Sequence, residues 1–347
     1  MTPTKGFAAQ DPKSDLAPWI FERREPGPHD VQIEILYCGV CHSDIHQVRD
    51  EWGGTIFPIV PGHEIVGRVS RVGEHVRKYK NGDLVGVGCM VDSCRECKNC
   101  KDDLEQYCEV GFVGTYNSRE LKTGAVTYGG YSNLIVTHED FVLKVSEDLP
   151  IEGVAPLLCA GITTYSPLRH WKVGQGHKVG VLGLGGLGHM AVKFAVSFGA
   201  EVTMLSHSPS KEADAKRLGA HRFALTSNPE IIKDLANYFD FIVDTVSAPH
   251  DYNTYLGMLN TNGTMICVGA PPAPAEIPAF NLIFQRRSIG GSLIGGIKET
   301  QEMLDYCAAN NITSDVEVIP MKDINHAYER MMKGDVRYRF VIDMATL

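Results

Sequence analysis

The 347-residue sequence has no apolar run long enough to cross a membrane and no cluster of basic residues. Its most apolar stretch, residues 179–196, is rich in glycine and interrupted by His189 and Lys193, whereas a spanning helix needs about 20 mainly apolar residues. The first residues show no apolar secretory core, so we expect a cytoplasmic protein. The net charge of −9 makes a nucleic acid an unexpected partner.

The bulk composition is that of a globular protein of more than one domain. Hydrophobic residues make up 44% and charged residues 22% of the chain. A chain of this length usually divides into two domains. Six of the ten cysteines fall into two candidate metal sets, and thiolate metal sites fit a reducing compartment better than a disulfide framework does.

Four of the cysteines lie close together, with the spacing C-x2-C-x2-C-x7-C. Thiolates at this spacing can surround one zinc ion in a tetrahedron, which is the closed arrangement of structural zinc sites. The residues between them are charged and poor in apolar side chains, so the metal would supply the folding energy of a lobe at residues 89–112. A disulfide knot, four thiols without a role and an iron–sulfur cluster are the alternatives. The predicted zinc ligands are Cys94, Cys97, Cys100 and Cys108.

A second candidate metal set is scattered along the chain. Cys41 lies in C-G-V-C-H-S-D, His63 in P-G-H-E and Cys159 in L-L-C-A-G. Two thiolates and one imidazole leave the fourth position of zinc open, as in catalytic zinc sites. Taken singly, each residue has a structural explanation, as a small buried side chain or a turn residue. A helix expected to begin near Ser43 would favour the thiolate of Cys41, because a helix N-terminus attracts negative charge.

The local patterns divide the chain near residue 150. Short strands predicted at residues 31–36, 65–69 and 84–87, separated by glycine turns, indicate a β-rich first domain. Beyond residue 150, alternating strands and helices indicate an α/β fold with a doubly wound parallel sheet, followed by a proline-rich rigid loop at 271–274. The predicted elements are strands 178–182, 201–205, 241–244 and 264–269 and helices 190–198, 211–218 and 300–309.

The run G-L-G-G-L-G follows the first of these later strands and opens a helix. This context is the one that a dinucleotide fingerprint requires, because glycines let the backbone approach the pyrophosphate and the helix N-terminus offers free N–H groups. A turn that serves only helix–strand packing is the alternative. The glycines are Gly183, Gly185, Gly186 and Gly188.

The end of the second strand indicates which dinucleotide binds. NAD sites carry an acidic residue there, but this chain reads L-S-H-S-P-S-K and has no acid before Glu212. Hydroxyl groups and an ammonium would hold the 2′-phosphate of NADP(H), which a carboxylate would repel. We therefore predict NADP(H) with Ser206, Ser208 and Lys211 as contacts, although Lys211 in a solvated loop is the alternative.

With these motifs the chain resembles the zinc-dependent medium-chain alcohol dehydrogenases, and among them the bacterial NADP-dependent members of the cinnamyl alcohol dehydrogenase family. The matching segments include Y-C-G-V-C-H-S-D-I-H, V-P-G-H-E-I-V-G, the cysteine lobe and D-V-R-Y-R-F-V-I-D, so they cover residues 37–343. The resemblance implies a GroES-like catalytic domain at 1–150 and 295–347 and a Rossmann domain at 151–294. It also implies a homodimer formed through the nucleotide domains, and an enzyme that interconverts alcohols and aldehydes.

The resemblance also implies roles for single residues. Asp44 would orient His63, and Glu64 would approach the metal. Ser43 would contact the substrate oxygen, and His46 would pass its proton to solvent through the cofactor ribose. His42 and Arg339 would face the pyrophosphate. Further cofactor positions are Thr163, Leu187, His207, Val268, Gly269 and Ile294.

The substrate pocket is the least defined part of the prediction. Candidate contacts are Trp52, Cys89, Phe112 and Tyr116. The run Glu51-Trp52-Gly53 departs from the plant cinnamyl enzymes, so we expect an apolar pocket for several aromatic and aliphatic aldehydes. An NAD-dependent polyol or formaldehyde dehydrogenase, and a non-catalytic zinc and dinucleotide binder, are the rival functions. The missing strand-end acid disfavours the first, and the complete ligand set disfavours the second.

Overall fold

The computed structural model describes residues 1–272 and 274–347 and divides the chain into two compact units. Unit 1 contains Met1–Ile162 and Gly295–Leu347, and unit 2 contains Thr163–Ile294. The sequence predicts the first boundary at residue 150, so this boundary is corrected to 162. Residues 151–162 stay with unit 1 because Leu157 and Leu158 are buried there and their turn packs on four strands of its sheet.

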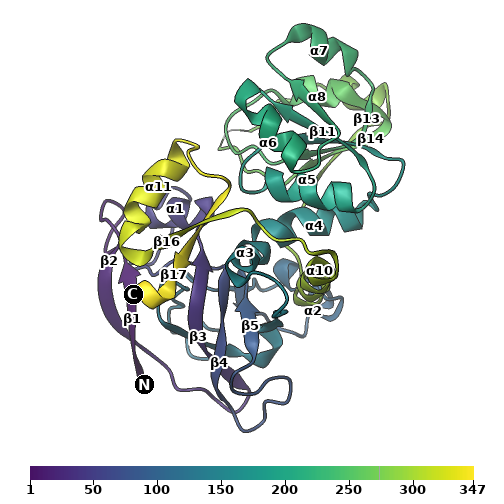
Figure 1. Cartoon of the computed structure of the whole chain (residues 1–347). Coiled ribbons are helices and arrows are strands. Elements are labelled where there is room, and N and C mark those ends of the chain that lie inside the picture. The colour runs from purple at the N-terminus through teal and green to yellow at the C-terminus, as the bar shows by residue number, and fades with distance from the viewer. Residues whose placement is uncertain (273) are drawn as a thin grey trace. The chain divides into compact units, whose positions relative to one another are not determined.

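Unit 1 is built around a seven-stranded sheet with the order β16-β17-β3-β4-β5-β9, in which β8 also pairs with β3. The central strand β3 buries Val31, Ile33 and Ile35, and it pairs antiparallel with β4 (Figure 1). The C-terminal segment joins this sheet, because β17 pairs with β3. The strands of the sheet are β3 (Asp30–Gly39), β4 (Ile65–Val72), β5 (Leu84–Val87), β8 (Leu134–His138), β9 (Leu143–Lys144), β16 (Val316–Pro320) and β17 (Arg339–Asp343).

Two small antiparallel sheets and short helices complete unit 1. One sheet pairs β1 (Thr2–Ala8) with β2 (Ala17–Arg23), and the other pairs β6 (Met90–Asp92) with β7 (Val113–Gly114). The α-helices are α1 (His42–Val48), α2 (Lys98–Lys101), α3 (Ile151–Val154), α10 (Ile297–Asn310) and α11 (Ile324–Met332). The 3-10 helices are η1 (Glu105–Tyr107), η2 (Glu139–Phe141), η3 (Ala155–Leu158), η5 (Met321–Asp323) and η6 (Met344–Thr346).

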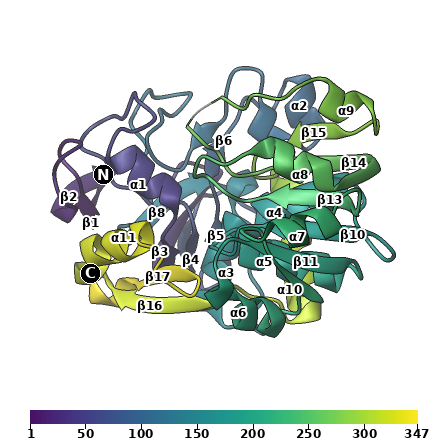
Figure 2. The same ribbon diagram turned by 90° about the horizontal axis from the view of Figure 1, so that it is seen from above.

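Unit 2 is the predicted doubly wound sheet. Its six strands are parallel, in the order β12-β11-β10-β13-β14-β15, so the chain runs outward from the centre first to one side and then to the other (Figure 2). This is the strand order of the Rossmann fold. The strands are β10 (Lys178–Leu182), β11 (Glu201–Ser206), β12 (Arg222–Leu225), β13 (Phe239–Asp244), β14 (Leu259–Cys267) and β15 (Ser288–Gly291).

The helices of unit 2 pack on these strands, and several bounds differ from the prediction. The predicted helix 211–218 is a 3-10 turn followed by a shorter helix, because Pro209 opens a tight turn ahead of it. The predicted strand 264–269 begins at Leu259, since it continues backwards through an irregular pairing that alternation does not show. The predicted loop 271–274 includes Ala273, which lies outside the described residues. The helices are α4 (Ala160–His170), which contains the unit boundary, α5 (Gly188–Ser197), η4 (Pro209–Lys211), α6 (Glu212–Arg217), α7 (Pro229–Asp234), α8 (Tyr252–Met258) and α9 (Phe280–Ile283).

Within the described part of the chain, none of the helices combines the length and the apolar character that crossing a membrane would require.

Candidate zinc and dinucleotide sites

Three separate segments of unit 1 bring together the scattered metal set. Cys41 caps α1 just after β3, His63 lies in the loop before β4, and Cys159 lies between η3 and α4. One donor atom from each of these residues, together with one from Glu64, lies within 4.8 Å of all the others, and all four residues are buried. The predicted three-ligand set is thus joined by the neighbouring carboxylate.

The spacing of the two thiols fits a single metal ion. The Sγ atoms of Cys41 and Cys159 are 3.9 Å apart. A tetrahedron with zinc–sulfur bonds of about 2.3 Å has edges of about 3.8 Å. The contact with Cys159 holds the pKa of Cys41 well below its usual range, while the contact with Cys41 raises the pKa of Cys159. Zinc binds thiolates, so both thiols must lose their protons when the metal binds.

Asp44 lies behind His63 and is fully buried. Its Oδ1 is 3.2 Å from Nδ1 of His63 and accepts the N–H of Gly62 at 3.1 Å. Its Oδ2 accepts the N–H of Cys41 at 2.8 Å, which closes the capping box of α1. The contact through Nδ1 leaves the other ring nitrogen of His63 for a metal, as outer carboxylates do in zinc sites.

Glu64 and Arg339 form a buried ion pair beside the same thiols. Nη2 of Arg339 donates to Oε1 of Glu64, and Nη1 lies 4.0 Å from Sγ of Cys41. Burial raises the pKa of Glu64 to about 7, although Arg339 opposes this shift. Among the described residues Oε2 of Glu64 has no hydrogen-bond partner, which fits a site that receives a cation. The structure therefore pairs the predicted pyrophosphate residue Arg339 with a carboxylate of the metal set.

The predicted relay residues lie on α1. The thiol of Cys41 is 3.6 Å from Oγ of Ser43, so that hydroxyl borders the metal set. His46 is three residues further along the helix, and its Nδ1 is 2.5 Å from Oε2 of Glu51. Its ring lies 4.9 Å from that of Trp52, which is 54% exposed. His42 is exposed, with its ring 6.4 Å from that of His46.

The other predicted pocket residues differ in their relation to the metal set. The ring of Tyr116 is buried and stacks on His63 at 5.7 Å. Cys89 donates to the carbonyl of Leu158 at 3.7 Å, next to Cys159 in the chain. Phe112 is half-buried and precedes β7.

The four-cysteine set forms a lobe between the paired strands β6 and β7. Its four Sγ atoms lie within 4.8 Å of one another, which leaves room for one ion but not for a cluster of several irons. All ten cysteines are free, and Cys94 and Cys100 are 3.9 Å apart at sulfur, about twice a disulfide bond length. Backbone N–H groups of Glu109 and Cys100 lower the pKa of Cys97 to about 6. The lobe is therefore suited to a closed zinc site and not to a disulfide knot.

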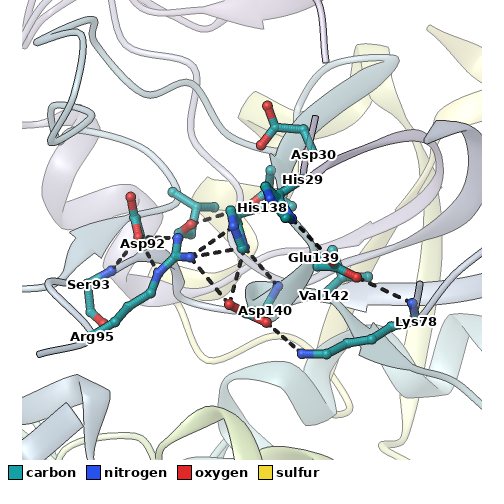
Figure 3. A network of polar contacts seen from close by, with 12 residues as sticks. His29, Asp30, Lys78, Asp92, Ser93, Arg95, His138, Glu139, Asp140 and Val142 are labelled. Atoms are coloured by element: carbon teal, nitrogen blue, oxygen red, sulfur yellow. Dashed lines mark hydrogen bonds and ion pairs between the residues drawn. The ribbon is translucent and has the colours of Figure 1, made fainter. Parts of the chain in front are cut away.

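Arg95, which follows the first cysteine of the lobe, ties this loop to the main sheet of unit 1 (Figure 3). Its guanidinium is 2.6 Å from Asp92, 3.3 Å from Asp140 and 2.9 Å from Nε2 of His138. Lys78 binds the second oxygen of Asp140 at 2.6 Å. These contacts anchor a loop that has few apolar side chains.

In unit 2 the glycine run forms a tight turn between β10 and α5. Gly183 has a φ of +89°, a conformation that favours glycine. A side chain at Gly188 would place its Cβ 1.9 Å from the carbonyl oxygen of Gly183, whereas one at Gly185 would meet open space. Gly186 and Leu187 complete the turn ahead of the helix. The turn thus leaves the start of α5 open to an anionic group, as dinucleotide binding requires.

The predicted phosphate loop begins at the carboxyl end of β11. Ser206 ends the strand and is buried, and its Oγ accepts the N–H of Ser208 at 3.2 Å. The hydroxyls of Ser208 and Ser210 are 2.9 Å apart. His207 is exposed, and Lys211 ends η4.

The remaining cofactor candidates lie at other positions of unit 2. Val268 and Gly269 follow β14, and both of their N–H groups donate to the carbonyl of Asp244 at 3.0 Å. Ile294 is buried beyond β15, and Thr163 is buried in α4.

The sequence reasoning missed Thr245, which donates to the carbonyls of Leu182 and Gly183 at 2.8 and 3.2 Å. Thr245 follows β13, where the strand order reverses, and ligands of doubly wound sheets bind there. Its place directly after the predicted strand 241–244 was the available signal.

Comparisons with known proteins agree with this architecture. The family model for the alcohol dehydrogenase GroES-like domain matches residues 27–147, and that for the zinc-binding dehydrogenases matches residues 186–309. The chain is 54% identical over 348 residues to NADP-dependent alcohol dehydrogenase C 1 of Mycolicibacterium smegmatis, covering 100% of this chain and 99% of that protein. It is 55% identical over 345 residues to the aldehyde reductase YahK of Escherichia coli, covering 99% of each. The crystal structure of the Helicobacter pylori CAD complexed with NADP(H) matches with a TM-score of 0.94 and 45% identity, over 99% of each chain. The chain therefore belongs to the zinc-binding dehydrogenases that carry the GroES-like domain of alcohol dehydrogenases.

Proposed function

We propose that this protein interconverts primary alcohols and aldehydes with NADP(H), using zinc at the Cys41 set and a second zinc in the cysteine lobe. The observation that carries the proposal is the buried convergence of Cys41, His63, Glu64 and Cys159 next to the helix that bears Ser43. The NADP-dependent relative and the NADP(H) complex of a similar enzyme support the cofactor, as does the absence of an acid at the end of β11.

Zinc and the nicotinamide would supply the reactive chemistry when bound. The residues of the chain would hold these groups in position and accept the proton of the alcohol. Zinc would polarise the oxygen of the substrate, and the nicotinamide would carry the hydride. Asp44 holds Nδ1 of His63 and so points the other ring nitrogen at the metal position. The burial of His63 and of both thiols excludes bulk water from this position.

Ser43 and His46 are the two ends of the proposed proton relay. The hydroxyl of Ser43 borders the metal set, where it would accept the proton of an alcohol. Residues three apart on a helix are neighbours, so His46 lies one turn away, and its side chain is 25% exposed. The contact of Nδ1 with Glu51 leaves Nε2 of His46 for proton transfer.

His46→Gln is expected to slow alcohol oxidation at least tenfold at pH 6–7, where bulk base is scarce, and less at pH 9. Positioned acid–base groups contribute about 10²–10⁴-fold, and an imidazole buffer should restore part of the loss. Single-turnover hydride transfer with saturating cofactor measures this, because product release can hide the step in steady-state rates. His75→Gln is the matched control, since His75 is exposed and lies outside α1. An unchanged His46→Gln rate between pH 6 and 9 would remove His46 from the relay.

The substrate is proposed to be an aromatic or aliphatic aldehyde, or the matching alcohol. The ring of Tyr116 and the thiol of Cys89 lie beside the metal set and are largely apolar. Trp52 adds a large apolar surface next to His46. No charged pocket residue is among these candidates, which favours uncharged substrates of several shapes.

We propose a homodimer that forms through unit 2. Among the described residues β15 is the last strand of its sheet, and Phe280, Ile283, Phe284 and Leu293 nearby in the chain are 47–76% exposed. Exposed apolar groups beside a sheet edge typically mark an interface. Light scattering is expected to give twice the chain mass of 38.1 kDa, and Phe284→Glu is expected to lower it to that of one chain. A wild-type mass of one chain would contradict the dimer.

We also propose that the protein works in the cytoplasm. All ten cysteines are free, and six of them are the proposed zinc ligands. Thiolates bind zinc only when reduced, so an oxidising compartment would oppose both sites. Fractionation of cells that produce the protein tests this location.

A further inference from the structure

The segment Gly129-Gly130-Tyr131 forms a backbone bracket around the residues that precede His63. The N–H of Gly129 donates to the carbonyl of Val60 at 2.7 Å, and that of Gly130 donates to Gly62 at 2.8 Å. The N–H of Tyr131 donates to Pro61 at 3.0 Å. Three consecutive donors therefore hold the loop whose next residue is a proposed zinc ligand.

The bracket needs the two glycines because the two backbones approach closely. A Cβ at Gly129 would lie 2.4 Å from the carbonyl oxygens of Pro61 and Gly62. A Cβ at Gly130 would lie 2.5 Å from Ile65 and 2.8 Å from Sγ of Cys38. Any larger residue would push the His63 loop outward or break the bracket.

Tyr131 also reaches the outer carboxylate of the site. Its ring is fully buried and packs on Gly62, where a Cβ would lie 2.7 Å from the tyrosine Cδ1. Its hydroxyl lies 3.4 Å from Oδ2 of Asp44 and accepts the hydroxyl of Tyr328 at 3.5 Å. Burial raises the pKa of Tyr131 well above its usual range, so this hydroxyl keeps the proton that it offers to Asp44.

Tyr131 is one of several groups around this fully buried carboxylate. The N–H groups of Cys41 and Gly62 and the ring of His63 contact Asp44, and the hydroxyls of Tyr131 and Tyr116 lie beside it as well. A buried charged acceptor that loses a donor becomes less well satisfied and less firmly oriented. The contact at 3.4 Å is long for a hydroxyl donor. Its loss should therefore weaken metal binding by about tenfold, the low end of the range of about 10–100-fold for outer contacts of a metal site.

We propose that Tyr131, together with the Gly129–Gly130 pair, is a positioning residue that fixes His63 and Asp44 for the zinc at the Cys41 set. This inference rests on the proposed zinc site. In this role Tyr131 acts through Asp44 and through the loop that carries His63.

The test is the rate at which the zinc-loaded enzyme transfers zinc to a coloured chelator. The wild-type protein should release two zinc ions in two phases, one from each set, and Cys159→Ser should remove the phase of the Cys41 set. Tyr131→Phe is expected to speed that phase roughly tenfold and to leave the phase of the cysteine lobe unchanged, since loss of an outer contact typically weakens a metal site 10–100-fold. Tyr328→Phe removes the hydroxyl that donates to the Tyr131 hydroxyl, so it should change the same phase in the same direction but by less.

Tyr79→Phe is the matched control. Tyr79 is also buried in unit 1, and its hydroxyl donates to the carbonyl of Val142 at 2.5 Å, so the variant loses a buried hydrogen bond away from the Cys41 set. Both zinc-release phases of the Tyr79→Phe variant should keep the wild-type rates, even if the melting temperature of the variant falls. Equal acceleration of both phases by Tyr131→Phe, or no acceleration, would overturn the positioning role.

Failure of the proposed function would give a different result. Wild-type protein that binds one zinc ion, or a Cys159→Ser variant that keeps both phases, would contradict the zinc assignment itself. Should Tyr131→Phe not fold, Tyr328→Phe provides the same comparison, and an unchanged phase there would count against the inference.

Discussion

Replacing Cys159 by serine is expected to leave about one zinc ion per chain and to lower the rate of alcohol oxidation by roughly 10³-fold or more. A Lewis-acidic metal contributes several kcal/mol to the stabilisation of a transition state, and each 1.36 kcal/mol corresponds to a factor of ten in rate. Cys159 supplies one of the two thiolates in a set of four donors, and the other sulfur is only 3.9 Å away. Serine at this position would therefore remove one of the two thiolate ligands. Metal analysis and steady-state rates with NADP⁺ measure both effects.

Loss of a cysteine from the cysteine lobe should lower the stability of the protein and leave its turnover largely unchanged. Cys97→Ser is expected to remove the other zinc ion and to lower the melting temperature by roughly 10 °C, because a loss of about 3 kcal/mol shifts a domain of this size by that order. Turnover per folded molecule should change little, since the lobe contains no proposed substrate or cofactor contact within Cys94–Cys108.

A third cysteine serves as the control for both variants. Cys307 is fully buried in α10 and lies outside both sets, so Cys307→Ser should retain two zinc ions and wild-type turnover. Equal thermal destabilisation with preserved turnover in Cys159→Ser and Cys97→Ser would contradict the division into a catalytic and a structural site.

Ser206→Asp is expected to weaken NADPH binding by roughly 10–100-fold and to leave NADH binding almost unchanged. Hydrogen bonds to a charged group contribute about 1.5–3 kcal/mol each, and a carboxylate at this position would also repel the 2′-phosphate. Ser206 is the last residue of β11, where NAD sites carry an acid, and its Oγ already orders the loop by accepting the N–H of Ser208. Dissociation constants of both cofactors, measured by titration, check this expectation.

Ser288→Asp provides the same charge change at the opposite end of the sheet. Ser288 begins β15, whereas Ser206 ends β11, and all six strands run parallel. This control should bind both cofactors like the wild type. Equal catalytic efficiency of the wild-type enzyme with NADPH and NADH would contradict the strand-end argument and favour an NAD-dependent polyol dehydrogenase.

Much of the candidate site could be predicted because its signals are local. The four-cysteine spacing lies within 15 consecutive residues, and the glycine run stands directly between a strand and a helix. The central strand Lys178–Leu182 has the bounds that its apolar run predicts. In each case the physical constraint acts between residues close in the chain, so the sequence alone is enough to predict the feature.

The scattered ligands were predicted from their residue types and then from the resemblance, but their surroundings required the fold. Asp44, Tyr131 and Tyr328 come from a helix, a loop and the C-terminal helix α11, and nothing in their spacing indicates that they meet. The Glu64–Arg339 pair spans 275 positions and exists because β17 pairs with β3 next to the metal set. The first domain boundary was misplaced for the same reason, since the packing of Leu157 and Leu158 decides to which unit residues 151–162 belong.

The sequence by itself therefore determined the candidate zinc ligands, the candidate position of a dinucleotide phosphate and the sheet that the second half forms. The tertiary structure alone decided how those side chains are held, because burial, backbone brackets and ion pairs between distant segments arise only when the strands pair. The close backbone approach at Gly129 and Gly130 illustrates the difference. Two glycines in a sequence indicate only freedom of the chain, whereas the carbonyl oxygens 2.4 Å from a Cβ at Gly129 show why no other residue fits there.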